Sequence, residues 1–251
     1  MSLKDEMNQQ LRELWKDNWT SAIWKENNQN GGLKRLWPHQ YHDLKYNCLV
    51  FVGLNPSFKV ADWLGESTFV KLDNVSDLDD PAKLANLEFA AKVRINGISD
   101  KKPYPYYDQF KNIAGSMGTD WQPIEVFCVR EPNQNVVKKY LGLDSGKSRN
   151  PTDFAKKQWD IFWNILSEIQ PSAVVVANAL ASKLIMNPGA LSSGESQKFK
   201  LEFDETSGDY YLESSHGKTP IFFSGMIHGT RSLDIGSRER LFWHIKRALK
   251  R

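Results

Sequence analysis

The fold class of this chain follows from the stretch YNCLVFVG at residues 46–53. Its continuous apolar run, ended by glycine and then asparagine and proline, is typical of a strand buried on both faces. Further runs of this kind lie at residues 124–129, 173–177 and 221–227. Four buried strands predict a mostly parallel sheet, because parallel strands are joined by helices that cover its faces.

Helical spacing of apolar residues appears before, between and after these runs. It predicts one or two leading helices over residues 3–24 and a helix over 151–169, with Asn150 as N-cap and Pro151 at the first position. A final helix capped by Ser237 closes the chain.

The predicted architecture is a three-layer αβα sandwich around a central four-stranded, mostly parallel sheet. Residues 1–44 form a helical extension packed on the core, and residues 45–251 form one α/β domain. Alternating apolar and polar residues near 198–213, broken by Ser207 and Gly208, predict a β-hairpin inserted into that domain.

Composition limits the classes of site that are possible. The 251 residues include only two cysteines, which excludes iron–sulfur clusters and four-cysteine zinc sites. Cys48 and Cys128 lie inside apolar runs, so we expect buried thiols in a reducing compartment. The histidines lack metal-ligand spacing, and we expect neither a metal nor a cofactor. Without a signal-like or membrane-spanning apolar stretch, the expected location is the cytoplasm, with no membrane partner.

Charge is unevenly distributed although the formal net charge is only +3. Residues 62–88 carry seven acids against two lysines, whereas 134–158 carry six bases against two acids and 237–251 six bases against one acid. Such a polarised chain favours a basic face toward a phosphate backbone. Solvated helix faces and a charged tail are the alternative interpretation.

Polar residues follow the first and last predicted strands, at the edge where α/β sheets bind ligands. Asn55 precedes Pro56, which favours an extended backbone that aims the amide into the crevice. Gly53 allows a ligand to approach the backbone closely. His228 follows the last strand. Taken singly, the Asn-Pro pair also fits a simple turn, and His228 a satisfied core histidine.

The Gly-Leu-Asn-Pro-Ser sequence at 53–57 and the His-Gly-Thr sequence at 228–230 together resemble the uracil-DNA glycosylase superfamily, in its mismatch-specific and single-strand-selective branches. Those branches carry Gly-hydrophobic-Asn-Pro-Gly at the first place and His-Pro-Ser or Asn-Pro-Ser at the last. The chain departs from them at Ser57 and at Gly229-Thr230. The resemblance covers about residues 45–251.

The resemblance implies excision of uracil or a related damaged base from DNA, with Asn55 orienting the attacking water and His228 stabilising the departing base. An amide cannot accept a proton from water, so a slow catalyst is expected. The remaining implied contacts are substrate-binding residues Gly53, Leu54, Pro56, Gly229 and Thr230, a stacking platform at Phe58, base-edge amides at Asn133 and Gln134, and a DNA contact at Arg231.

Phe69 and the tyrosines at 104–107 are alternative platforms, although each aromatic side chain also fits a core position. Two other functions remain open: a non-catalytic protein of this fold that binds nucleic acid or a nucleotide, and a hydrolase of a small nucleoside-like substrate that uses His228. The sequence leaves open the excised base, the preference for single- or double-stranded DNA and the oligomeric state.

Overall fold

The computed structural model describes residues 1–19, 38–56, 74–97, 103–131, 133–143, 150–192, 194–227 and 232–250. The chain divides into two compact units. Unit 1 comprises Met1–Asp43, Asn55–Tyr104 and Phe127–Ile161, and unit 2 comprises Leu44–Leu54, Pro105–Val126 and Phe162–Arg251.

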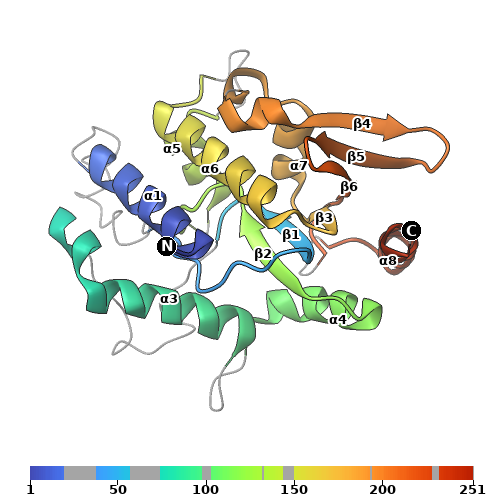
Figure 1. Ribbon diagram of the computed structural model, residues 1–251, viewed down its shortest axis with the longest axis horizontal. Helices are drawn as coiled ribbons and strands as arrows, with labels where there is room; N and C mark the ends of the chain where they lie inside the picture. Colours follow the sequence, from blue (N-terminus) through green and yellow to red (C-terminus); the bar gives the residue numbers. More distant parts are fainter. Residues whose placement is uncertain are drawn as a thin grey trace. The chain divides into compact units, whose positions relative to one another are not determined.

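Unit 2 contains a six-stranded mixed sheet with the strand order β2-β1-β3-β6-β5-β4. The strands are β1 (Leu49–Gly53), β2 (Trp121–Glu125), β3 (Ala173–Val176), β4 (Lys200–Asp204), β5 (Asp209–Ser214) and β6 (Gly217–Phe223). The first four in spatial order are parallel, and β5 and β4 are antiparallel to their neighbours (Figure 1). The carboxyl ends of the parallel strands therefore share one edge.

The prediction of an α/β fold is confirmed, but the prediction of a four-stranded sheet is wrong. The expected hairpin forms between β4 and β5, and β5 also pairs with β6, with Tyr210 opposite Ile221. The hairpin therefore extends the main sheet by two strands.

The second predicted strand is displaced toward the N-terminus, since 124–129 was expected and β2 is Trp121–Glu125. Within the described residues β2 pairs with β1 alone, and a proline such as Pro123 is tolerated in an edge strand. The apolar residues that follow β2 are buried outside the strand, and Val129 forms an isolated bridge with Pro38.

Unit 2 also contains several helices. They are α4 (Asp108–Met117), α7 (Ala179–Met186), α8 (Ile235–Leu249), the second half of α6 (Asp153–Ile169), and the short 3-10 helices η5 (Pro105–Tyr107), η6 (Gly189–Leu191) and η7 (Gly194–Lys198). Helices α7 and α8 both contact β3, while α4 contacts β2. Phe51 of β1 stacks on Phe110 of α4 with ring centroids 4.2 Å apart.

Two predicted helix caps are wrong by two or three residues. Helix α8 begins after Asp234, whose carboxylate accepts from the Ser237 N–H, so Ser237 lies inside the first turn. Helix α6 begins after Thr152, whose hydroxyl oxygen accepts from the Ala155 N–H at 3.2 Å, and not after Asn150. In both cases the N-cap is a nearby residue whose side-chain oxygen accepts a hydrogen bond from the first turn, as the predicted residue was expected to do.

Unit 1 is mainly helical. Its described elements are α1 (Leu3–Asn18), η4 (Val75–Asp79), α3 (Pro81–Asn96), α5 (Gln134–Leu141) and the first half of α6. Trp15 of α1 packs edge-on against Phe154 of α6, with ring centroids 4.8 Å apart. The buried Asn8 amide donates to Tyr41 O and accepts from Tyr41 N, each at 2.8 Å, so its burial is compensated. The part of the leading helical prediction beyond residue 19 lies outside the described residues.

Both cysteines are buried and free, as predicted. Burial raises the pKa of the Cys48 thiol to about 11, so this group stays protonated near neutral pH. None of the helices in the described ranges is both long enough and apolar enough to cross a bilayer.

Candidate functional site

Asn55 of unit 1 has a fixed amide orientation. Its Nδ2 donates two hydrogen bonds, to Val129 O at 3.0 Å and to Glu131 O at 2.7 Å. Both amide hydrogens are therefore used, and Oδ1 is the atom left to accept a hydrogen bond from a water or a ligand. The same bonds tie the segment after β1 to the segment after β2.

The two amides expected to read a base edge have structural roles at the start of α5. Asn133 caps this helix, because its Oδ1 accepts from the Asn135 N–H at 3.0 Å, and Gln134 is the first helical residue. The Asn133 N–H in turn donates to the buried Glu131 side chain at 2.9 Å. Asn133 Nδ2 remains the group that can donate to a ligand.

A buried basic cluster accompanies these residues in unit 1. His39 is 7% exposed and Arg130 4% exposed. Burial, and then the positive charges of Arg130, Arg94 and His42, hold the pKa of His39 well below its usual range. His39 is therefore neutral at physiological pH, and Arg130 provides the buried positive charge of this region.

In unit 2, Gly53 ends β1 directly opposite Glu125, the last residue of β2. Glu125 is 7% exposed, and a β-carbon added to Gly53 would lie 2.1 Å from its Oε2. Glycine at this position is what allows a carboxylate to lie over the end of β1. Leu54 follows and is 2% exposed, whereas Pro56 in unit 1 is buried.

A solvent-open hollow of about 540 Å³ lies at the carboxyl ends of β3 and β6, and we name it the α7–α8 hollow. Its lining comprises Ala179, Ser182 and Lys183 from α7, Phe223, Ser224 and Gly225 at the end of β6, then Leu233, and Ser237, Arg240, Leu241 and His244 from α8. The α8 residues fall at i, i+3, i+4 and i+7, which places them on one face of that helix.

His244 is held in this wall by a buried carboxylate. Its Nδ1 lies 2.9 Å from Oδ1 of Asp209, which is 3% exposed at the start of β5. Arg247 donates to the same carboxylate and to Ser207 O. Because a carboxylate only accepts, Nδ1 of His244 is the donor in this contact.

The hydroxyl groups of the α7–α8 hollow already donate to protein oxygens. Ser182 Oγ donates to Asn178 O at 2.9 Å, Ser224 Oγ to Gly225 O at 3.0 Å, and Ser237 Oγ to Asp234 at 2.6 Å. Lys183 and Arg240 are exposed and form no ion pair with any described residue. These two cations are therefore the groups available to an anion.

Several predicted site residues lie outside the described residues: Phe58, His228, Gly229, Thr230 and Arg231, together with the alternative platform Phe69. Of the other platforms, Tyr106 and Tyr107 pack on Phe110 of α4, at centroid distances of 5.0 and 5.9 Å. Tyr107 is buried and belongs to the aromatic core of unit 2, and Tyr106 is half-buried beside it. Asn178, after the third strand, caps α7 by accepting from Leu180 N and Ala181 N.

Sequence reasoning missed Glu125, Asp209 and the α8 face. A single acid inside the apolar run at 124–129 was a signal for Glu125, and the spacing of Arg240 and His244 was a signal for the α8 face. Asp209 gave no local signal, because its partners on α8 are 35 and 38 residues further along the chain.

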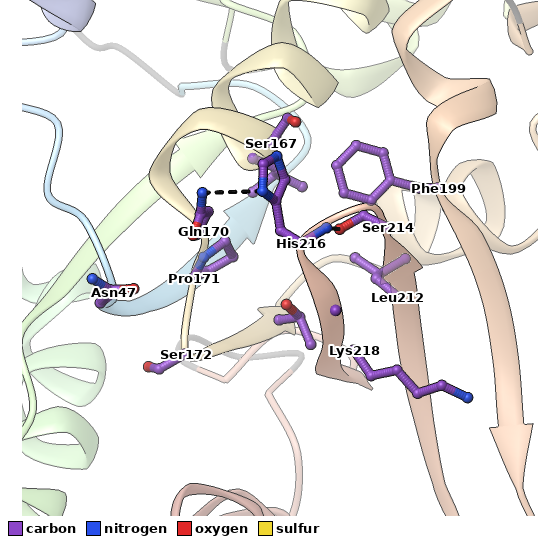
Figure 2. A pocket seen from close by; sticks show the side chains of 13 residues that line it. Asn47, Ser167, Gln170, Pro171, Ser172, Phe199, Leu212, Ser214, His216 and Lys218 are labelled. Atoms are coloured by element: carbon purple, nitrogen blue, oxygen red, sulfur yellow. Dashed lines mark hydrogen bonds between the residues drawn. The ribbon is translucent and has the colours of Figure 1, made fainter.

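A second cavity of about 260 Å³ lies at the opposite, amino-terminal edge of the sheet (Figure 2). Gln170 Nε2 and His216 Nδ1 lie 3.3 Å apart in its wall. Asn47 and Gln170 have φ values of 51° and 47°, but Gln170 ends α6 with a bond to Leu166 O, and asparagine tolerates this region. This backbone is explained by a turn and a helix end.

The sequence was compared with known proteins, and it matches neither a protein-family model nor a curated protein.

Proposed function

We propose that this protein is a DNA base-excision glycosylase of the uracil-DNA glycosylase type, built as a three-layer αβα sandwich and working in the cytoplasm. It hydrolyses the bond between C1′ of deoxyribose and the nitrogen of uracil or a related damaged base. The order of the Gly-Leu-Asn-Pro and His-Gly-Thr sequences after the first and last parallel strands supports this proposal.

The observation that carries the proposal is the orientation of the Asn55 amide. With both Nδ2 hydrogens donated to Val129 O and Glu131 O, Oδ1 accepts one hydrogen of the attacking water. As the glycosidic bond breaks, its electron pair moves onto the base, where His228 donates a hydrogen bond to the developing charge. The water oxygen bonds to C1′ and its proton passes to solvent, since an amide cannot take it.

The experiment is a gel assay of base release from uracil-containing oligonucleotides, single- and double-stranded, under single-turnover conditions. Wild-type protein is expected to cleave slowly. His228→Ala is expected to lower the rate by about 10²- to 10³-fold, the usual effect of removing one preorganised donor. His216→Ala is the matched control, because this exposed histidine lies at the amino-terminal edge of the sheet.

Asn55→Ala is expected to lower the rate as strongly, and a thermal melt of the same preparation tests whether the variant stays folded. Base release by both variants at the wild-type rate would overturn the mechanism. No release of any base by wild-type protein would overturn the function.

A second candidate function is nucleic-acid binding without catalysis on the same fold. The observation that favours it is the charge of the α7–α8 hollow, which is lined by Lys183 and Arg240 and by no acid among the described residues. Salt-sensitive retention of DNA without base release would select this function.

A further inference from the structure

Lysines in and next to the hairpin of unit 2 are paired with acids, whereas most basic side chains of α7 and α8 form no ion pair with a described residue. Lys200 and Lys218 both contact Glu202, at 2.5 and 2.8 Å, and Lys198 contacts Glu195. Hydrogen bonds from Lys200 and then from Lys218 lower the pKa of the Glu202 carboxyl to about 2. The hairpin surface is thereby neutralised.

On α7 and α8 the basic side chains keep their charge uncompensated. Lys183, Arg238, Arg240 and Lys246 form no ion pair within the part of the chain that the structure describes. The one basic residue of α8 that is paired, Arg247, is bound to Asp209. Of these four unpaired cations, Lys183 and Arg240 line the α7–α8 hollow.

An exposed aromatic side chain accompanies this charge. Trp243 of α8 is 57% exposed, although a residue of this size is usually well covered. It follows Arg240 by three residues, so the two are neighbours on the helix surface. The Arg247 guanidinium lies 4.7 Å from the indole centroid, and the His244 ring meets the indole edge-on at 5.0 Å.

The two side chains that contact the indole are themselves fixed. Arg247 and His244, which flank it, are both bound to the buried Asp209 carboxylate of β5. An exposed aromatic ring close to unpaired cations is the arrangement that binds single-stranded nucleic acid, in which phosphates meet the cations and an unpaired base stacks on the free face of the ring.

We propose that α8 and the α7–α8 hollow bind one strand of DNA, with Lys183 and Arg240 on phosphate groups and Trp243 stacked on an unpaired base. The inference deepens the proposed function, on which it rests for the choice of DNA. It assigns the protein a preference for single strands, because a base that is paired and stacked in a duplex does not offer its face to an indole.

The test measures binding of a fluorescein-labelled 12-nucleotide oligothymidylate by fluorescence anisotropy between 50 and 200 mM salt. This strand contains no uracil, so binding is measured independently of base release. The full chain is compared with K183Q/R240Q, with W243A and with W243F. The matched control is K92Q/K111Q, which removes the same charge from exposed lysines that form no ion pair with a described residue.

For K183Q/R240Q we expect the slope of log K against log salt to become shallower by about 1.4, or about 0.7 for each lost phosphate contact on a single strand. For W243A we expect affinity to fall by about 5- to 150-fold, the usual range for one stacked base, while W243F keeps most of it. The same sequence as a duplex is expected to bind more weakly and to be insensitive to W243A.

The proposal is overturned if K92Q/K111Q changes the slope as much as K183Q/R240Q does, or if W243A binds like the wild-type protein. It is also overturned if polyglutamate of equal charge displaces the strand as well as unlabelled oligothymidylate, which would indicate an acidic protein partner. Strand binding without any base release contradicts only the proposed function. Base release by a protein whose α8 variants bind normally contradicts only this inference.

Discussion

The Glu125 carboxylate lies against the α-carbon of Gly53, so close that a β-carbon at Gly53 would be 2.1 Å from Oε2. The two residues are register partners at the carboxyl ends of β1 and β2. The contact explains why β1 ends in glycine, and it places a buried carboxylate at the sheet edge where α/β proteins bind ligands.

Gly53→Ala is therefore expected to destabilise the protein by about 1–3 kcal/mol, the usual cost of overpacking a filled site. The measurement is urea unfolding at pH 7. In a Glu125→Ala background the same substitution should cost much less, because the opposing carboxylate is gone. An equal cost in both backgrounds would show that the strain arises elsewhere.

Asn55→Asp is expected to be less stable than Asn55→Ala. Each change removes the donors to Val129 O and Glu131 O, which costs about 1–3 kcal/mol for unsatisfied groups. Aspartate in addition directs a negative charge toward two carbonyl oxygens. Urea midpoints at pH 7 and pH 4.5 test this expectation, since protonation of the new carboxyl group restores one donor. A stable N55D variant with faster base release would contradict the fixed amide orientation.

Asp209→Ala is expected to lower the free energy of unfolding by about 1–3 kcal/mol. Removing one partner of a buried ion pair usually costs more, but the side chains of His244 and Arg247 are 30% and 27% exposed, so solvent compensates part of the loss. Guanidinium unfolding provides the value, and Asp209→Asn should lie between the alanine variant and the wild type. If the alanine variant unfolds at the wild-type midpoint, the carboxylate does not anchor α8.

His39 is expected to make stability depend on pH below about 6.5. Burial, followed by Arg130, Arg94 and His42, depresses the pKa of His39 in the folded chain. The unfolded chain then binds one more proton in this range, so stability is complete above the unfolded pKa and falls as the pH drops below it. Unfolding of wild type and His39→Gln between pH 4.5 and 7.5 measures the difference. His216→Gln is the control, and identical pH profiles for wild type and His39→Gln would refute the assignment.

The positions of β1 and β3 could be predicted because each is a short, continuous and buried apolar run. The predicted runs at 124–129 and 221–227 overlap β2 and β6 only in part, because both of these strands include polar residues and a proline outside the apolar run. β2 is displaced from the predicted range because it includes Gln122 and Pro123 outside the apolar run, while the apolar residues after Glu125 do not continue the strand. Only the order of strands in space shows that β2 is an edge strand, where proline is tolerated. The pairing of β5 with β6 could not be predicted either. Alternating apolar and polar residues predict that two strands form a hairpin, but they do not show which further strand the hairpin pairs with.

Residues of the candidate site could be predicted only where a neighbouring residue in the sequence constrains the backbone. Asn55 stood out because a proline follows it, but its acceptors are main-chain carbonyls more than 70 residues away, and any sequence offers those. The bond between Asp209 and His244 depends on the placement of β5 beside β6 and of α8 against the sheet. Side chains that act through such long-range contacts leave no periodic pattern.

The two edge strands of the sheet also determine whether another chain can pair with the sheet. An unpaired strand margin is a template for a neighbour's backbone and hence for aggregation. At one margin β2 carries Pro123, which has no N–H to offer, and at the other β4 carries the charged pair of Lys200 and Glu202. Neither margin favours fibril growth by added strands.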